Sequence, residues 1–258
     1  MMAGCGRVAG KVAVITGSSG GMGEGIARRL AEEGAAVVIS GRRAERCRLV
    51  ADEIAATGAR ALAIPADVSR EADCVALIHG TQAHFGRIDI LVNNAAITPQ
   101  EPDLQVGCEL WDEVFDVNVR GAFLCCREAI PLMRAQGGGA IINIGTGMAY
   151  LGSTHRLAYS CSKGALLTLT RTLAKAYAPD KVRVNWVTVG WVATPGEIAL
   201  KTETYGNGVA FLADAAAKSP LGELERVEDI ANGVLYLASD EASHVIGAEL
   251  NITGGRRI

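Results

Sequence analysis

The chain has 258 residues, of which 49% are hydrophobic and 21% are charged, and its formal net charge is −3. This composition is typical of a globular protein that can bury a sizeable core. The negative charge provides no basic field for nucleic acid, and aromatic residues, at 5%, are too sparse to suggest a base-stacking surface.

Short runs of aliphatic and β-branched residues alternate with longer segments of helical periodicity. Most of the strand candidates are apolar on both faces, as buried parallel strands are. The alternation predicts one Rossmann-like, doubly wound α/β domain over residues 1–258, with about seven parallel strands and helices on both faces. We expect strands over residues 12–16, 36–40, 61–64, 88–92, 140–144, 182–187 and 248–252. We expect helices over residues 44–56, 72–84, 110–133 and 227–238, a further helix that contains Ile26 and Leu30, and one from Tyr159 to Tyr177.

Residues 194–221 form the least regular stretch, between the sixth strand and the last helix. They follow the carboxyl end of a strand, where open α/β sheets bind their ligands. Because loops of this length in compact domains are usually functional, we predict a substrate lid here. A plain surface excursion is the alternative.

A glycine cluster follows the first predicted strand and opens the first helix, where residues 16–23 read Thr-Gly-Ser-Ser-Gly-Gly-Met-Gly. Glycines allow a tight turn and a close backbone approach to a pyrophosphate, and a helix N-terminus offers N–H groups to the phosphates. The spacing of Gly17, Gly21 and Gly23 departs from the G-x-G-x-x-G fingerprint. Although such a cluster can be a simple turn, its strand-to-helix position favours a nucleotide site.

The second predicted strand ends in Ser-Gly followed by Arg42 and Arg43, where the dinucleotide fingerprint has an acid for the ribose 2′-hydroxyl. Guanidinium groups suit a 2′-phosphate instead. We therefore favour NADP(H) as the cofactor, with NAD(H) as the alternative. The competing interpretation is that both arginines are ordinary surface residues of a first helical turn.

Tyr159 and Lys163 are four residues apart at the start of a predicted helix, so their side chains share one face. A free phenol has a pKa of about 10. A neighbouring ammonium favours the phenolate and lowers that pKa toward neutrality, where proton transfer is most useful. Alone, such a pair is more typical of a solvated helix face, so its catalytic interpretation depends on the other motifs.

Together these segments resemble the short-chain dehydrogenase/reductase family, and the resemblance covers nearly the whole chain. Residues 16–23 resemble its T-G-x-x-x-G-x-G loop, residues 93–95 its N-N-A segment, and Tyr159 with Lys163 its Y-x-x-x-K motif. Asn118 matches the helix asparagine of its proton relay. The resemblance implies cofactor contacts from Gly17, Ser19, Gly21, Met22, Gly23, Arg42, Arg43, Asp67, Val68, Asn94, Ala95, Tyr159, Lys163, Val192 and Thr194.

Three positions depart from the family pattern. Thr146 stands thirteen residues before Tyr159, where the family usually has serine; it keeps the hydroxyl but adds a methyl group that stiffens χ1. Ala96 replaces the glycine of N-N-A-G, which matters if that backbone needs a positive φ. Val189 replaces the proline before Gly190, so one fixed φ is lost and an N–H donor is restored.

The resemblance implies an NAD(P)-dependent oxidoreductase that transfers a hydride while Tyr159 gives or takes the proton on the substrate oxygen. Thr146 would hydrogen-bond that oxygen, Lys163 would lower the pKa of Tyr159 and bind the nicotinamide ribose, and Asn118 would hold a water linking Lys163 to solvent. The alternatives are a non-catalytic nucleotide-binding sensor or scaffold, and an epimerase or dehydratase that uses the cofactor transiently.

The substrate is expected to be a small carbonyl or alcohol, and an acyl thioester, a sugar or polyol and a cyclic ketone remain open. His155 and Arg156 favour a hydroxylated or anionic substrate, whereas the aromatic residues favour a ring or an alkyl chain. Each of these residues can equally be surface or lid packing. The candidate pocket residues are Met148, Tyr150, His155 and Arg156 before Tyr159, and Trp191, Tyr205, Phe211 and Leu212 near the lid.

The expected setting is cytoplasmic, with no membrane and no nucleic-acid partner. Residues 1–9 lack an apolar leader, and no apolar run approaches the length of a membrane span. Seven scattered cysteines without C-x-x-C suit a reducing compartment and, with only four histidines, suggest no metal site.

The resemblance implies a homo-oligomer, a tetramer or a dimer. Two helix faces could pair across a twofold or be buried within the subunit: Leu124, Cys125, Cys126 and Ile130, and Leu166, Leu169 and Leu173.

Overall fold

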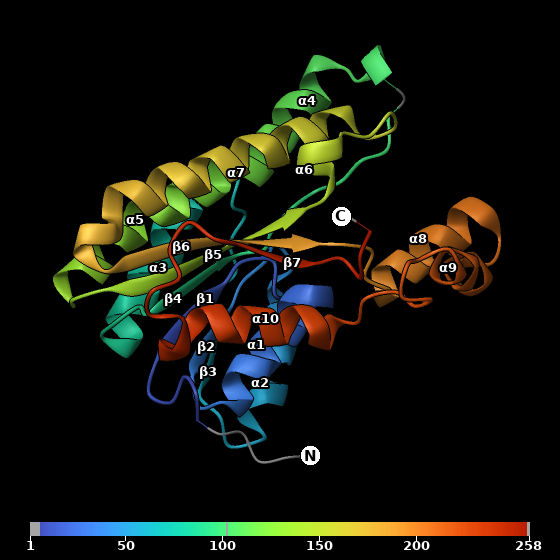
Figure 1. The fold of residues 1–258 in the computed structure, drawn as a ribbon. Helices are drawn as coiled ribbons and strands as arrows, with labels where there is room; N and C mark the ends of the chain where they lie inside the picture. Colours follow the sequence, from blue (N-terminus) through green and yellow to red (C-terminus); the bar gives the residue numbers. More distant parts are fainter. Residues whose placement is uncertain (1–5, 102, 257–258) are drawn as a thin grey trace.

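A seven-stranded parallel sheet runs through the molecule in the order β3-β2-β1-β4-β5-β6-β7 (Figure 1). The computed structural model describes residues 6–101 and 103–256, so residues 1–5, 102 and 257–258 of the predicted domain lie outside the described residues. The strand order reverses between β1 and β4, which is where doubly wound sheets bind ligands. The strands are β1 (Val12–Ile15), β2 (Ala36–Ile39), β3 (Ala61–Ala63), β4 (Ile90–Asn93), β5 (Gly139–Thr146), β6 (Val182–Val189) and β7 (Glu249–Ile252).

Helices cover both faces of the sheet, and a buried cluster of aliphatic side chains lies on each face. Figure 1 shows α5 and α7 on one side of the sheet and α1, α2 and α10 on the other. Successive strand residues alternate between the two clusters, because Val14 packs toward α3 and α5 while Ile15 packs toward α1. The helices are α1 (Gly21–Glu32), α2 (Ala44–Ala55), α3 (Glu71–Phe85), α4 (Cys108–Phe115), α5 (Gly121–Ala135), α6 (Met148–Leu151), α7 (Leu157–Tyr177), α8 (Pro195–Tyr205), α9 (Gly208–Ala217) and α10 (Val227–Ala238), with 3-10 turns at Asp103–Gln105, Ala178–Asp180 and Asp240–Ala242.

The predicted helix over residues 110–133 is divided in the structure. A π-helical turn, Asp116–Arg120, separates α4 from α5. Such turns occur often at functional sites, and this one contains Asn118, which is 1% exposed. Hydrophobic periodicity does not reveal a single wide turn, so the sequence indicated one continuous helix.

The prediction that residues 194–221 are irregular was wrong, because this segment contains α8 and α9. The Thr194 hydroxyl accepts a hydrogen bond from the Glu197 backbone N at 3.1 Å and caps α8. The Asn207 side chain accepts from the Ala210 backbone N at 3.0 Å and caps α9. Thr-Pro at the start of α8 is a recognisable helix signal, but the surrounding glycines obscured it. Figure 1 shows the two helices forming an arm beside the sheet.

The α5 face that could have paired across a twofold is buried within the subunit. Leu124, Cys125, Cys126 and Ile130 are at most 3% exposed and belong to the core under the sheet. Homo-oligomerisation stays a prediction. Within the described part of the chain, no helix is both long and apolar enough to cross a membrane, and no group of three or more His, Cys, Asp and Glu side chains could hold a metal ion.

Candidate active site

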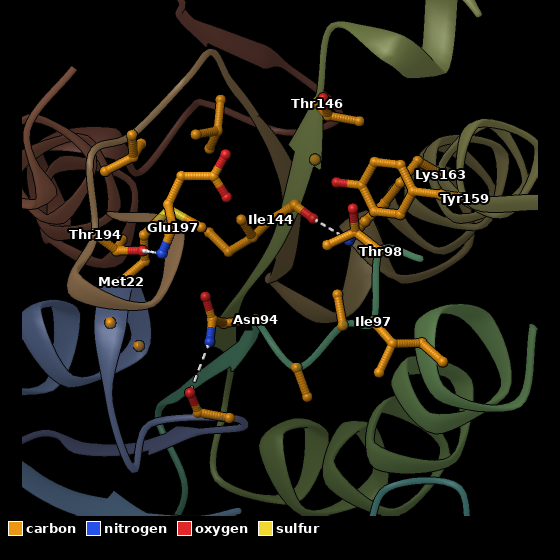
Figure 2. A pocket seen from close by; sticks show the side chains of 18 of the residues that line it. Met22, Asn94, Ile97, Thr98, Ile144, Thr146, Tyr159, Lys163, Thr194 and Glu197 are labelled. Atoms are coloured by element: carbon orange, nitrogen blue, oxygen red, sulfur yellow. Dashed lines mark hydrogen bonds between the residues drawn. The ribbon is translucent and has the colours of Figure 1, made fainter. Parts of the chain in front are cut away.

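A cavity of about 1010 Å³ opens at the carboxyl ends of β1, β4, β5 and β6. Figure 2 shows Tyr159 and Lys163 on one side of it and Thr194 and Glu197 on the other. Thr146, Tyr159, Lys163 and every residue predicted to contact the cofactor line this cavity, whereas Asn118 does not. The fold therefore brings together segments from seven parts of the sequence. The roles of these residues stay predictions.

The glycine-rich loop after β1 packs too closely for side chains. Gly17 has a φ of 65°, and a Cβ there would lie 2.9 Å from the Cα of Ala95. A Cβ on Gly23 would overlap the carbonyl group of Gly17. No side chain caps the N-terminus of α1, and residues 20–23 line the cavity. This is the arrangement in which backbone N–H groups bind a pyrophosphate.

Thr16 joins the glycine loop to the end of β4, a role that sequence reasoning missed. Its hydroxyl accepts hydrogen bonds from the backbone N of Asn94 and of Ala95, both at 3.1 Å. The Asn94 side chain in turn donates to the carbonyl groups of Thr16 and Gly17, at 2.9 and 3.1 Å. The threonine that opens the T-G motif was the available signal.

Two exposed guanidinium groups, Arg42 and Arg43, line the cavity directly after β2. They lie beside the glycine loop, because a Cβ on Gly20 would be 4.0 Å from Nη2 of Arg43. Asp67 lies nearby, and its Oδ1 accepts hydrogen bonds from the backbone N and the hydroxyl of Ser69, at 3.0 and 2.7 Å. Val68 packs against Gly121, where a Cβ would come within 2.8 Å of the valine. These contacts fix the part of the cavity wall that follows β3. The two arginines lie at the same part of the cavity, where they can bind an anion.

Tyr159 and Lys163 lie one turn apart in the first half of α7, as their spacing predicted. The Lys163 ammonium is 5.8 Å from the centroid of the Tyr159 ring and donates to the Ile144 carbonyl at 2.8 Å. Lys163 is 2% exposed, and burial lowers its pKa to about 8. Thr146, the last residue of β5, is close enough to Tyr159 to act on the pKa of its phenol.

The predicted lowering of the Tyr159 pKa is not found. Burial raises the pKa of the phenol above its ordinary value, and this effect outweighs the lowering by the Arg156 charge and by the Thr146 hydrogen bond. A phenolate loses more solvation than a neutral phenol when water is removed. Burial in this structure therefore favours the protonated form of the phenol.

Asn118 organises the site from behind the cavity wall. Its Oδ1 accepts from the backbone N of Ile97 at 2.8 Å, and its Nδ2 donates to the Ile97 carbonyl at 2.9 Å and to the Ser162 hydroxyl at 3.0 Å. Ser162 donates to the Tyr159 carbonyl at 2.7 Å. The contacts of Asn118 thus fix the loop after β4 against the helix that carries Tyr159.

The segment after β6 closes one side of the cavity. Val192 forms an isolated bridge with Glu225, whose carboxylate accepts a hydrogen bond from the backbone N of Trp191 at 2.8 Å. A Cβ on Gly190 would overlap this carboxylate. The segment is thus fixed by a buried acid, Glu225, which is 6% exposed.

Two of the departures from the family pattern are accommodated by the backbone. Ala96 needs no positive φ, since Lys181 is the one described residue other than glycine that has one. Val189 is the last residue of β6 and pairs with both neighbouring strands. The Gly190 backbone N continues this pairing by donating to the Ile252 carbonyl at 3.0 Å. Strand pairing therefore holds the backbone where the family has a proline ring.

The candidate substrate residues divide into two groups. Met148, His155, Arg156 and Trp191 line the cavity. Tyr150 does not, and its hydroxyl donates to Glu249 at 2.6 Å instead. Tyr205 and Phe211 stack on each other within the arm, with ring centroids 4.3 Å apart, and Leu212 is buried. Cavity-lining residues that sequence reasoning missed include Ile97, Thr98, Gln100, Leu151, Ser153, Glu197, Lys201, Thr253 and Arg256.

Comparison with known proteins extends the likeness over almost the whole chain. A family model described as enoyl-(acyl carrier protein) reductase matches residues 17–257. The cis-4-hydroxycyclohexanecarboxylate dehydrogenase of Sinomonas cyclohexanicum is 39% identical over 246 residues, which cover 95% of this chain and 96% of that protein. A 3-oxoacyl-[acyl-carrier-protein] reductase of Staphylococcus aureus is 34% identical over 95% of this chain and 97% of that protein.

A solved structure shows the same arrangement of elements. The L-sorbose reductase of Gluconobacter frateurii, complexed with NADPH and L-sorbose, matches with a TM-score of 0.92 and 32% sequence identity. The match covers 99% of this chain and 98% of that chain.

Proposed function

Because this chain belongs to the short-chain dehydrogenase/reductase family of NAD(P)-dependent oxidoreductases, we propose that it interconverts a secondary alcohol and a carbonyl with Tyr159 as the acid-base group. One observation carries the proposal. Tyr159, Lys163 and Thr146 meet at one wall of a cavity whose other end is an uncapped helix N-terminus behind a close-packed glycine loop.

The cavity suits a dinucleotide, and we propose NADP(H). The glycine loop and residues 20–23 would hold the pyrophosphate, and Arg42 and Arg43 would hold the 2′-phosphate. The relative from Gluconobacter frateurii is described in complex with NADPH, which supports this choice. Val192 and Thr194 would contact the nicotinamide end. When bound, the cofactor supplies or accepts the hydride.

Tyr159 moves the proton at the substrate oxygen. In reduction, the phenol donates its proton to the carbonyl oxygen as the carbon gains the hydride, and in oxidation the phenolate takes the proton from the alcohol. Thr146 donates a hydrogen bond to the same oxygen and stabilises the charge that develops there. Lys163, an ammonium below its pKa of about 8, stabilises the phenolate that Tyr159 becomes.

The arm formed by α8 and α9 is proposed as the substrate lid within residues 194–221, and the whole chain as one catalytic domain. Thr194, Glu197 and Lys201 all line the cavity. The N-cap residue of α8 and two residues of the helix thus line the cavity, so a movement of this helix changes the shape of the cavity directly.

The test follows nicotinamide absorbance with NADPH and NADH over a panel of ketones, sugars and acyl thioesters, and with 4-hydroxycyclohexanecarboxylate in the oxidative direction. Tyr159→Phe should lower turnover by about a hundredfold or more while NADP⁺ binding, followed by fluorescence, is unchanged. Tyr177→Phe, at the far end of the same helix, is the matched control. Turnover retained in Tyr159→Phe would contradict the assignment.

A further inference from the structure

Positive side chains gather at the substrate end of the cavity, although the chain as a whole carries a net charge of −3. Arg156, Lys201 and Arg256 line this part, and Glu197 is the acid among the lining residues there. Unlike Arg42 and Arg43, Arg156 and Lys201 lie on segments that carry candidate substrate residues, and Arg256 lies against the Trp191 ring. An excess of positive charge in a recessed site attracts an anion.

Lys201 is a buried cation, 4% exposed, inside the arm. Its ammonium lies 5.5, 5.7 and 5.5 Å from the ring centroids of Trp191, Tyr205 and Phe211. Within residues 6–101 and 103–256, Glu197 is its one ion-pair partner, with a separation of 3.6 Å between Nζ and Oε1. The rings attract the cation through their faces but do not neutralise its charge.

Glu197 is not dedicated to this lysine. Its Oε1 also accepts a hydrogen bond from the indole nitrogen of Trp191 at 2.8 Å. The carboxylate thus fixes the tryptophan as well as facing Lys201. Because the backbone N of Trp191 donates a hydrogen bond to Glu225, this tryptophan is fixed through both its main chain and its side chain.

Arg256 approaches the same indole ring from the turn after β7. Its guanidinium carbon is 5.8 Å from the Trp191 ring centroid, and its Nη2 donates to the Ala215 carbonyl at 3.1 Å. Its Nε is buried and has no hydrogen-bond partner among the described residues. No carboxylate of the described chain forms an ion pair with it. A buried N–H of a charged group without an acceptor is unfavourable, so a ligand oxygen there would relieve it.

We propose that Arg256 and Lys201 bind a carboxylate of the substrate, so that the substrate is a hydroxy acid in one direction and an oxo acid in the other. A planar guanidinium matches a carboxylate with two N–H donors, and the ammonium adds a second charge. Ile97, Met148 and Leu151 line the same cavity and provide apolar surface for the carbon skeleton. This inference rests on the proposed function.

The first experiment measures binding without turnover. Cyclohexanecarboxylate, benzoate and butanoate are titrated by calorimetry into the protein saturated with NADP⁺, each against its uncharged amide. At least one carboxylate should bind about tenfold or more tightly than its amide, and the difference should shrink at high salt. Equal affinity within every pair, or binding of no probe, overturns the proposal.

The variants are Arg256→Met and Lys201→Met. Their matched controls are Arg134→Met and Lys218→Met. The guanidinium of Arg134 lies 5.9 Å from the Tyr177 ring, and Lys218 pairs with an acid four residues earlier, as Lys201 does. Each site variant should lose about tenfold in carboxylate affinity and leave amide binding unchanged, and the controls should change neither. Arg256→Lys should recover part of the loss, because it restores the charge without the planar fork.

Two further readouts separate this inference from its alternatives. If the site variants weaken NADP⁺ binding and leave carboxylate binding intact, the cations serve the cofactor and the proposal is wrong. On a turned-over hydroxy acid, the variants should raise KM with little change in kcat, as expected for a contact made equally in ground and transition states. Efficient turnover of neutral alcohols and hydroxy acids alike would overturn the carboxylate site while leaving the proposed function intact. Carboxylate binding without any hydride transfer would support the carboxylate site and contradict the proposed function.

Discussion

The side-chain amide of Asn118 holds the backbone of Ile97 from both sides, accepting from its N–H at 2.8 Å and donating to its carbonyl at 2.9 Å. The same amide reaches Ser162, which is bonded to the Tyr159 carbonyl. One buried residue in a π-helical turn therefore sets the position of a cavity loop relative to the helix that carries Tyr159.

Replacing Asn118 by the similarly sized leucine should lower kcat/KM by about a hundredfold, because a misplacement of about 1 Å in a site can have an effect of this size. Asn118→Asp keeps the acceptor for Ile97 N and loses the two donations, so it should lie between the wild type and Asn118→Leu. Steady-state kinetics on folded variants, checked by circular dichroism, measures both. Wild-type kcat/KM in Asn118→Leu would show that the loop is held by other contacts.

Thr146 provides the hydroxyl at the end of β5, where the family usually has serine. Thr146→Val keeps the shape and removes the hydroxyl, so kcat should fall by roughly a hundredfold to a thousandfold, as for the loss of an oxyanion donor. Thr146→Ser keeps the hydroxyl and should remain within about threefold of the wild type. The pair of variants separates the hydroxyl from the methyl group, and equal kcat values would refute the hydrogen-bond role.

Lys163 should make stability depend on pH. Burial lowers its pKa from 10.5 to about 8, so between these values the unfolded chain binds a proton that the folded chain does not, and stability rises with pH. Below pH 8 the ammonium is buried at its full cost, roughly 3 kcal/mol. Urea unfolding of the wild type and of Lys163→Met is measured at neutral pH and near pH 10. Between these two pH values the free energy of unfolding of the wild type should rise relative to that of the variant. A constant difference between them would contradict the lowered pKa.

Arg42 and Arg43 should select between the two cofactors. The double variant with alanine at both positions should raise KM for NADPH about tenfold or more, because charge-assisted hydrogen bonds to the 2′-phosphate are lost. KM for NADH should change little. Arg46→Ala, in the helix that follows them and paired with Glu24, is the control. An equal rise for both cofactors would place the arginines elsewhere on the dinucleotide.

Gly145 on β5 lies directly under the Trp186 ring, so a Cβ there would overlap the indole. Gly145→Ala should lower the free energy of unfolding by about 1–3 kcal/mol, the range for overpacking a core. Gly107→Ala, where a Cβ meets nothing within 4 Å, should leave it nearly unchanged. Urea denaturation measures both, and equal stability of the two variants would show that the indole can move.

The sequence predicted the sheet well because its strands are short, apolar runs between turn residues. Helix α2, Ala44–Ala55, ends one residue before the predicted limit, and the Tyr159–Lys163 spacing placed both side chains on one helix face. The raised pKa of Tyr159 was not predictable, because the burial of its phenol depends on segments far apart in the chain. Arg256 was missed for the same reason, since the turn after β7 meets the arm only in the folded chain.

Two adjacent backbone amides, those of Gly190 and Trp191, are held by different partners. The first donates to the Ile252 carbonyl of β7 and the second to the side chain of Glu225. Deuterium exchange at the first reports on fraying of the sheet edge, whereas exchange at the second reports on release of the segment that leads to the arm. The exchange rates of these two adjacent amides therefore report on two different motions. Comparing the rates with and without ligand measures how far the motion of the arm is independent of the sheet.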